Sequence, residues 1–181
     1  KLTSMGDLMH ALPAITEAKE NIDDISFDWV ADTNFASVPS WHPLVNKIIT
    51  TNHRNWKKQL FSKNSRKSLK DVINQINESD YDLVVDMQNN LKSAFISYLC
   101  EHDVVGMDSE SVREYPAHLA YSKKINVDKK LHAIERQKKL LGDSLGYKYK
   151  QNPINYGASF DKFIKPDITL PHKYFVLVQN A

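Results

Sequence analysis

The 181-residue sequence contains few glycines, a single cysteine and no long apolar run. Its five glycines stand too far apart to form GxGxxG or GxxxxGKS/T, which excludes the two common glycine-rich loops that bind phosphates. No apolar run approaches the roughly 20 residues that span a bilayer, and no signal peptide is visible. With 41% hydrophobic and 25% charged residues, the composition indicates an ordinary soluble globular protein, which we expect to be cytoplasmic.

Cysteine and histidine form no metal-binding motif. The single Cys100 excludes a disulfide within the chain and is typical of a reducing compartment. It lies in an apolar run, so we interpret it as a small buried hydrophobe and not as a nucleophile. The seven histidines are dispersed, no HExxH motif is present, and one cysteine cannot form a zinc cluster. We therefore predict no metal site and no cofactor.

Positive charge is concentrated in one segment. Residues 51–70 contain seven lysines and arginines and no acidic residue, whereas the whole chain has 24 basic and 22 acidic residues. The rest of the chain is therefore mildly acidic. Such a local excess indicates an anionic partner, but a solvated lysine-rich loop and helix face has the same composition. Composition alone leaves both interpretations open.

Strand and helix patterns alternate along the chain. Apolar, β-branched runs predict strands at residues 27–31, 47–51, 81–86 and 104–105. Apolar residues at helical spacing predict helices at residues 68–78, 91–100 and 131–145. This alternation is typical of an α/β fold with an open parallel sheet, whose strands are joined by helical crossovers.

The two ends of the chain suggest interrupted elements. A helix follows Asp7 with no strand before it, so we expect that a preceding strand is missing; Pro13 predicts a kink or a helix start. Residues 174–178 resemble a buried strand, and a proline-punctuated stretch precedes them. The predicted domains are a Rossmann-like domain at 1–150, a linker at 151–172, and the first strand of a truncated second domain at 173–181.

Polar residues follow several predicted strands, where an open parallel sheet binds its ligands. Asp7, next to Gly6 at the mouth of the first helix, suits a general base, but an acidic residue is also favoured at a helix N-terminus for purely structural reasons. The other candidates are Asp86, Gln88, Lys92 and Arg113. For these, capping or starting the next helix is as good an interpretation as substrate contact.

The opening of the chain resembles the first motif of the lipopolysaccharide heptosyltransferase I family, at Thr3-Ser4-Met5-Gly6-Asp7-Leu8-Met9-His10-Ala11-Leu12-Pro13-Ala14. Further similar blocks follow in family order at 27–30, 39–42, 48–49, 86–88, 92–94, 106–108, 113–114, 132–136 and 144–147. The opening block is more similar to the first heptosyltransferase family than to the second. Asn89 stands where the family usually has glycine, and Asn55 where it tends to have a basic residue.

This resemblance implies the N-terminal, acceptor-binding domain of a GT-B glycosyltransferase, in which two Rossmann-like halves face each other across a cleft. The implied reaction is an inverting, metal-independent transfer of L-glycero-D-manno-heptose from ADP-heptose to Kdo of the Kdo2-lipid A inner core. By position, Asp7 matches the catalytic base. The substrate-binding residues are expected to be Ser4, Met5, Gly6, Arg54, Lys57, Lys58, Gln88, Lys92 and Arg113. Because the family's donor site follows the strand at 174–178, we expect the chain alone to be inactive.

The implied acceptor carries phosphates and carboxylates, which suit an all-basic segment beside a single carboxylate base. The resemblance further implies a monomer in peripheral contact with the cytoplasmic face of the inner membrane. Two alternatives remain: a stand-alone module that binds anionic glycolipid through residues 51–70, and a related glycosyltransferase with another sugar donor. Nucleic acid fits poorly as a partner, because only Trp56 and Phe61 interleave with the cations.

Overall fold

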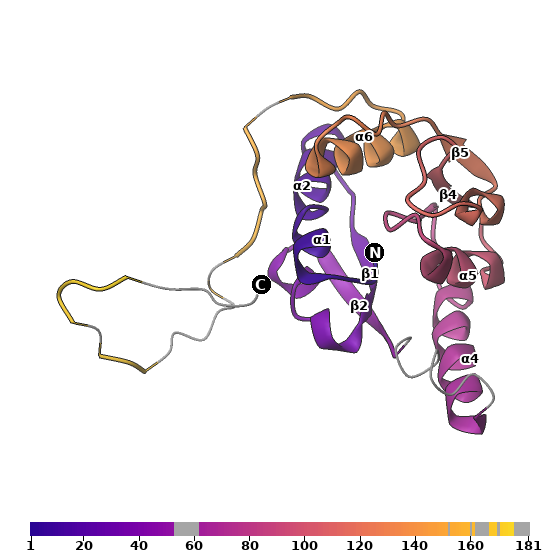
Figure 1. The fold of residues 1–181 in the computed structure, drawn as a ribbon, viewed down its shortest axis with the longest axis horizontal. Coiled ribbons are helices and arrows are strands. Elements are labelled where there is room, and N and C mark those ends of the chain that lie inside the picture. The colour runs from indigo at the N-terminus through magenta and orange to yellow at the C-terminus, as the bar shows by residue number, and fades with distance from the viewer. Residues whose placement is uncertain (53–61, 152, 160, 162–166, 170, 176–181) are drawn as a thin grey trace.

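A computed structural model describes residues 1–52, 62–151, 153–159, 161, 167–169 and 171–175. Parallel strands alternate with helices, which confirms the predicted α/β class (Figure 1). The strands are β1 (Phe27–Asp32), β2 (Val45–Thr51), β3 (Val84–Val85), β4 (Val104–Met107) and β5 (Lys123–Ile125). The α-helices are α1 (Met5–Met9), α2 (Leu12–Asn21), α4 (Lys63–Asn77), α5 (Leu91–Leu99) and α6 (Ala133–Leu145). Short 3-10 helices are η1 (Thr33–Phe35), η2 (Pro39–Trp41) and η3 (Ala117–Ala120).

Local sequence signals explain where the helices begin and end. Pro13 lies in the first turn of α2, so the predicted first helix is divided into α1 and α2. The side chain of Ser62 accepts a hydrogen bond from the Ser65 backbone N–H, which starts α4 earlier than the predicted residue 68. Gly146 ends α6 in the left-handed conformation, with φ of 86°, as expected for a helix C-terminus.

The strands form two parallel sheets among the described residues, where one open sheet was predicted. β1 pairs with β2, and β4 lies between β3 and β5. The predicted strand at 81–86 is reduced to the two residues of β3, because β3 is paired only on its β4 side. β5 was not predicted: two of its three residues are exposed lysines, so it carries little strand pattern.

A cavity of about 570 Å³ separates the two sheets. Residues of both flanking strands line it, including Trp29 of β1 and Val85 of β3. The first residues of the chain close one end, where the Leu2 carbonyl accepts from the Asp32 N–H (3.0 Å) and the Leu2 N–H donates to Gln88 Oε1 (3.1 Å).

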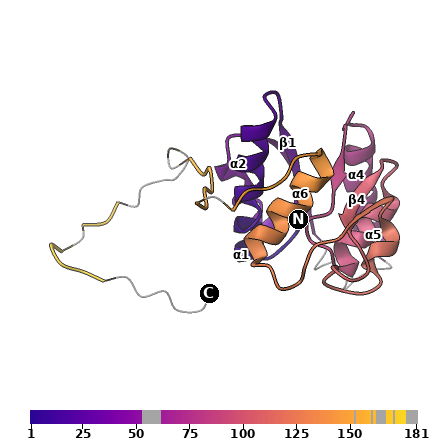
Figure 2. The same cartoon turned by 90° about the horizontal axis from the view of Figure 1, so that it is seen from above.

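Helix α6 joins the two sheets. It packs on α2 beside the first sheet and also contacts β4 and β5 of the second (Figure 1). Figure 2 shows the same helix lying across the middle of the molecule. The main core gathers beneath it and includes Leu12 and Ile15 of α2 with Leu140 and Leu141 of α6. A buried ion pair between Glu17 and Lys138 (3.4 Å) lies in the same contact; the named core side chains and this ion pair hold the two helices together.

The region assigned to a linker, 151–172, has no regular structure at residues 153–159, yet part of it packs on the domain. The Ser159 N–H donates to the Trp41 carbonyl (2.8 Å), and Tyr156 packs against the main core. Tyr174 and Phe175 are in no strand, and residues 176–178 lie outside the described residues. The predicted division into 1–150, 151–172 and 173–181 therefore stays a prediction.

Candidate active site

Asp7 lies in the first turn of α1, directly after the loop of residues 1–4, and its side chain is 30% exposed. Its Oδ2 accepts the Ser4 backbone N–H (3.2 Å) and is 3.2 Å from Nη1 of Arg113. The carboxylate is thus fixed on one oxygen by the loop's own backbone and by a side chain 106 residues away. A carboxylate that is held in place and still open to solvent suits proton abstraction from a bound hydroxyl.

Arg113 is positioned through its backbone. Its N–H donates to the carbonyl of Asn89 (3.0 Å), and the next N–H, of Glu114, donates to the same oxygen (3.3 Å). Nearby, Nη2 of Arg136 donates to the Ser111 carbonyl (2.6 Å). The loop that carries Arg113 is therefore bound on both sides, while the Arg113 side chain itself stays 59% exposed.

The backbone conformation at Asn89 explains how asparagine can stand where the resembled family usually has glycine. Its φ is 55°, in the left-handed region that glycine adopts freely and asparagine tolerates best among the other residues. Its Oδ1 also accepts the Met107 N–H (2.6 Å), which a glycine cannot do. Asparagine thus keeps the backbone conformation and adds a bond from the loop to β4.

Gln88 and Asp86 hold backbone in place in this structure. Gln88 is buried, and its Oε1 accepts the N–H groups of Leu2 (3.1 Å) and Thr3 (3.3 Å). It therefore holds in place the loop of residues 1–4, which leads into α1 and Asp7. Asp86 accepts the N–H groups of Gln88 and Asn89 on Oδ1 and the Tyr121 hydroxyl (2.8 Å) on Oδ2. Both oxygens of Asp86 are therefore occupied, which favours the structural interpretation of this residue.

Lys1 is a residue of the site that sequence reasoning missed. Its Nζ donates to the Met87 carbonyl (3.2 Å). Burial lowers the pKa of the Lys1 ammonium to about 8, an effect that the carboxylates of Asp7 and Asp86 oppose. Burial and the neighbouring Arg113 guanidinium likewise lower the pKa of Arg136. Asp7 thus interacts with two cationic side chains, those of Lys1 and Arg113. The signal that could have found Lys1 is its position six residues before Asp7.

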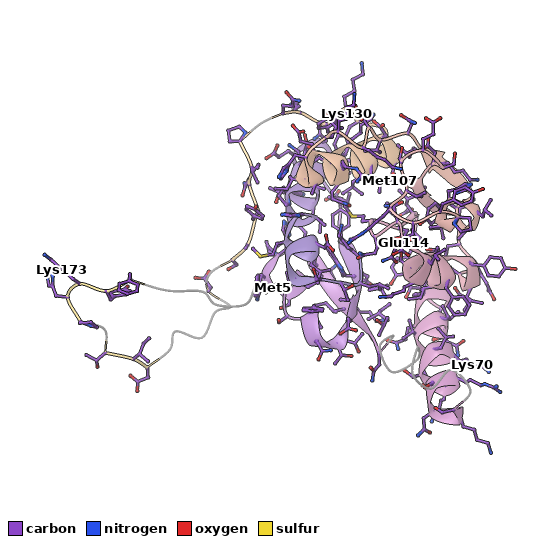
Figure 3. The ribbon with its side chains drawn as sticks, viewed as in Figure 1. Met5, Lys70, Met107, Glu114, Lys130 and Lys173 are labelled. Atoms are coloured by element: carbon purple, nitrogen blue, oxygen red, sulfur yellow. The ribbon has the colours of Figure 1, made fainter. Side chains whose placement is uncertain are left out.

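The remaining predicted residues divide into those near Asp7 and those that are not described. Met5 is 48% exposed on α1 (Figure 3). An added Cβ at Gly6 would meet no atom within 4 Å, so the first turn of α1 has open space beside it. Lys92 is exposed on α5, and no contact joins it to Asp7. Arg54, Lys57 and Lys58 lie outside the described residues.

The described residues contain no group of three histidine, cysteine or acidic side chains that could hold a metal ion. His10 and His132, far apart in sequence, have ring centroids 5.9 Å apart in an edge-on contact. Since His132 also accepts the Ile134 N–H at the start of α6, this pair packs α1 against α6. Within the part of the chain that the structure describes, no helix has the length and apolar character to cross a membrane.

Comparison with known proteins supplies what the geometry alone does not. Residues 69–181 match glycosyltransferase family 9 (heptosyltransferase). The chain belongs to this family. It is 41% identical over 163 residues to lipopolysaccharide heptosyltransferase 1 of Escherichia coli K12, covering 88% of this chain and 50% of that protein. The corresponding enzyme of Pseudomonas aeruginosa is 35% identical over 177 residues, covering 97% of this chain and 50% of that protein.

A solved structure agrees with this assignment to glycosyltransferase family 9. The E. coli heptosyltransferase WaaC with ADP-2-deoxy-2-fluoro heptose superposes with a TM-score of 0.83 at 39% identity, covering 86% of this chain and 50% of that one. The same enzyme with ADP gives 0.82. The predicted resemblance and fold class are thus confirmed. The chain spans about half the length of the relatives it matches.

Proposed function

We propose that this chain is the acceptor-binding half of a lipopolysaccharide heptosyltransferase I, which transfers heptose from ADP-heptose to Kdo of the Kdo2-lipid A inner core. The observation that carries the proposal is the partly exposed carboxylate of Asp7 in the first turn of α1, held by the Ser4 N–H and by Arg113. Support for the donor comes from the relatives, one of which was solved with an ADP-heptose analogue. In this proposal the donor binds to the half of the enzyme that this chain does not span.

In the proposed reaction Asp7 acts as the general base. The acceptor hydroxyl gives its proton to the Asp7 carboxylate while its oxygen forms a bond to the anomeric carbon of heptose. The bond from that carbon to the diphosphate breaks, and ADP leaves with the electron pair. Attack opposite to the leaving group inverts the anomeric configuration, so a single carboxylate on the attacking side is sufficient.

The residues around Asp7 have separate roles in this proposal. Ser4 and Arg113 keep Asp7 Oδ2 in place. The exposed guanidinium of Arg113 can also pair with a phosphate or carboxylate of the acceptor, because it presents several donors in a planar fork. Gln88 maintains the loop and has no direct contact with the acceptor in the proposal.

The test is Asp7→Asn in the full-length protein. Asparagine keeps the size and an oxygen but cannot accept the proton, so kcat should fall by about 10²- to 10⁴-fold. Acceptor affinity, measured by calorimetry, should change little. Normal turnover by this variant would show that Asp7 is not the general base. The 181-residue chain alone should transfer no heptose and bind no ADP-heptose; tight donor binding would contradict the division of roles between the halves.

A further inference from the structure

Helix α5 carries large apolar side chains on its exposed face. Leu91, Phe95 and Tyr98 are spaced i, i+4 and i+7, which places them on one side of the helix. They are 49%, 48% and 74% exposed. The buried residues of α5 are Ser93, Ala94, Ile96 and Ser97. The helix thus carries three large apolar side chains on the face that does not meet the core.

The segment around η3 extends this exposed face. Tyr115 is 74% exposed and Leu119 is 70% exposed, and η3 packs directly beside α5. The two segments are also joined where Glu114 Oε2 accepts the Leu91 N–H (3.0 Å). We define the α5–η3 patch as Leu91, Phe95, Tyr98, Tyr115 and Leu119. A contiguous group of this kind marks an interaction surface, whereas single exposed apolar side chains do not.

Basic residues flank this patch on the neighbouring helix. The first half of α4 carries four exposed cations, Lys63, Arg66, Lys67 and Lys70, and its first acidic residue is Asp71. Helices α4 and α5 share a core cluster that includes Ile73 and Ile96, and both lie on the side of the molecule away from α2 (Figures 1 and 2). Lys70 extends away from α4 into solvent (Figure 3).

We propose that the α5–η3 patch and the basic half of α4 form the surface by which this protein rests on an anionic lipid bilayer. Apolar side chains that enter the headgroup region, tyrosines at its level and cations beside anionic lipids are the components of interfacial membrane binding. The cations on α4 favour a bilayer over a second copy of the chain, because an isologous dimer would pair this surface with an equally basic one.

The position of the patch connects it to the candidate active site. Arg113 contacts Asp7, and the next residue, Glu114, binds the Leu91 N–H at the start of α5. Tyr115 of the patch is therefore two residues away from Arg113 of the site, and Leu91 is bonded to the residue between them. This part of the inference rests on the proposed function: an acceptor anchored in a bilayer would meet Asp7 while the patch stays on the same membrane.

Sedimentation of the full-length protein with vesicles tests the surface. The vesicles contain phosphatidylethanolamine and phosphatidylglycerol at about three to one, a bacterial-like anionic surface. Phe95→Ser should lower the partition coefficient about tenfold, since a large aromatic side chain no longer leaves water. The matched control is Ile154→Ser, which removes an apolar side chain that is similarly exposed (53% against 48%) but lies outside the patch; its partition coefficient should equal that of the wild type.

Two results would overturn the proposal. One is equal partitioning of Phe95→Ser and the wild type. The other is a loss of self-association in Phe95→Ser with unchanged vesicle binding, which would identify the patch as an interface between two copies. An assay of heptose transfer to a deacylated, water-soluble acceptor tests the proposed function separately from membrane binding. Phe95→Ser should transfer heptose to this acceptor at the wild-type rate. If the wild-type protein transfers none, the proposed function is contradicted, but the result with vesicles still holds.

Discussion

Arg113 contacts Asp7 through an ion pair whose arginine side is open to solvent. Exposed pairs of this kind contribute about 1 kcal/mol or less to stability, so removing the guanidinium should hardly change the free energy of unfolding. Its effect on Asp7 is different, because the same Oδ2 that Arg113 holds belongs to the proposed base. The pair therefore matters for orientation more than for folding.

We expect Arg113→Ala in the full-length protein to lower kcat/KM by about 10- to 100-fold, because a charge-assisted contact to Asp7 and to an anionic acceptor is lost. Arg113→Lys keeps the charge without the planar fork and should recover part of this loss. Separate kcat and KM values, measured across pH, distinguish a change at the base from weaker acceptor binding. Lys130→Ala, an exposed cation elsewhere, serves as the control; equal values for both alanine variants would contradict the role.

Cys100 should be an unreactive thiol. Its Sγ donates to the Ile96 carbonyl (3.2 Å), and burial, together with the Asp86 carboxylate, raises the pKa of the thiol to about 11. The thiolate population at pH 8 is then about 100-fold lower than for an unperturbed cysteine, and only thiolate reacts with iodoacetamide. Labelling at pH 8 should be slow in the native protein and fast in denaturant. Equal rates in the two states would show that the helix does not protect this thiol.

Sequence reasoning separated functional from structural residues only in part. Asp7 and Asp86 both stand close to the start of a predicted helix, and the pattern left a purely structural interpretation open for each. The structure separates them through distant partners: Tyr121 occupies the second oxygen of Asp86, whereas Arg113 leaves Asp7 partly open. Gln88 was placed among the substrate contacts because local sequence could not show that its side chain binds the backbone of residues 2 and 3.

At the scale of elements, β4 depends on a close approach between backbone and ring. A Cβ at Gly106 would overlap the ring of Tyr121, whose hydroxyl is fixed on Asp86. The ring cannot move away without breaking that buried hydrogen bond. The position thus requires glycine for lack of space, and not for an unusual φ.

We predict that Gly106→Ala lowers the free energy of unfolding by about 1–3 kcal/mol, the usual cost of adding a methyl group to a packed core. Denaturant unfolding measures this change. Gly6→Ala is the matched control: its Cβ would meet no atom within 4 Å, and alanine is favoured over glycine in a helix, so this variant should not lower the free energy of unfolding. Unchanged stability of Gly106→Ala would mean that Tyr121 has room the structure does not show.

Elements with strong local patterns were predicted well. β1, β2 and α5 were placed within two residues of their observed bounds, because apolar periodicity and helix-capping residues act locally. β3 was overestimated for the opposite reason: residues 81–86 have high strand propensity, but a strand needs partners, and one edge of β3 faces the cavity. β5 was missed because its pairing with β4 depends on position and not on its own residues.

For the whole molecule, the family and fold class could be predicted from the order of motifs, which the comparisons confirm at 35–41% identity. The arrangement of the two sheets could not be predicted from the sequence. Strand order depends on which edges meet in space. Here α6 connects the two sheets through α2, β4 and β5, and Leu2 bonds to Asp32 of β1 and to Gln88, which follows β3. The cavity between these strands is therefore the main difference between the predicted and the observed fold.

A designed extension before Lys1 tests whether the cavity between β1 and β3 accepts a strand. About five alternating β-branched residues match the length of a typical strand and could pair with the free sides of β1 and β3, joining both sheets into one. This variant should unfold at higher denaturant than a chain with a Gly-Ser extension of equal length, which removes the charged amine without supplying strand residues. The comparison isolates strand pairing from the loss of charge. Identical unfolding of the two extended chains would show that the cavity does not accept a strand.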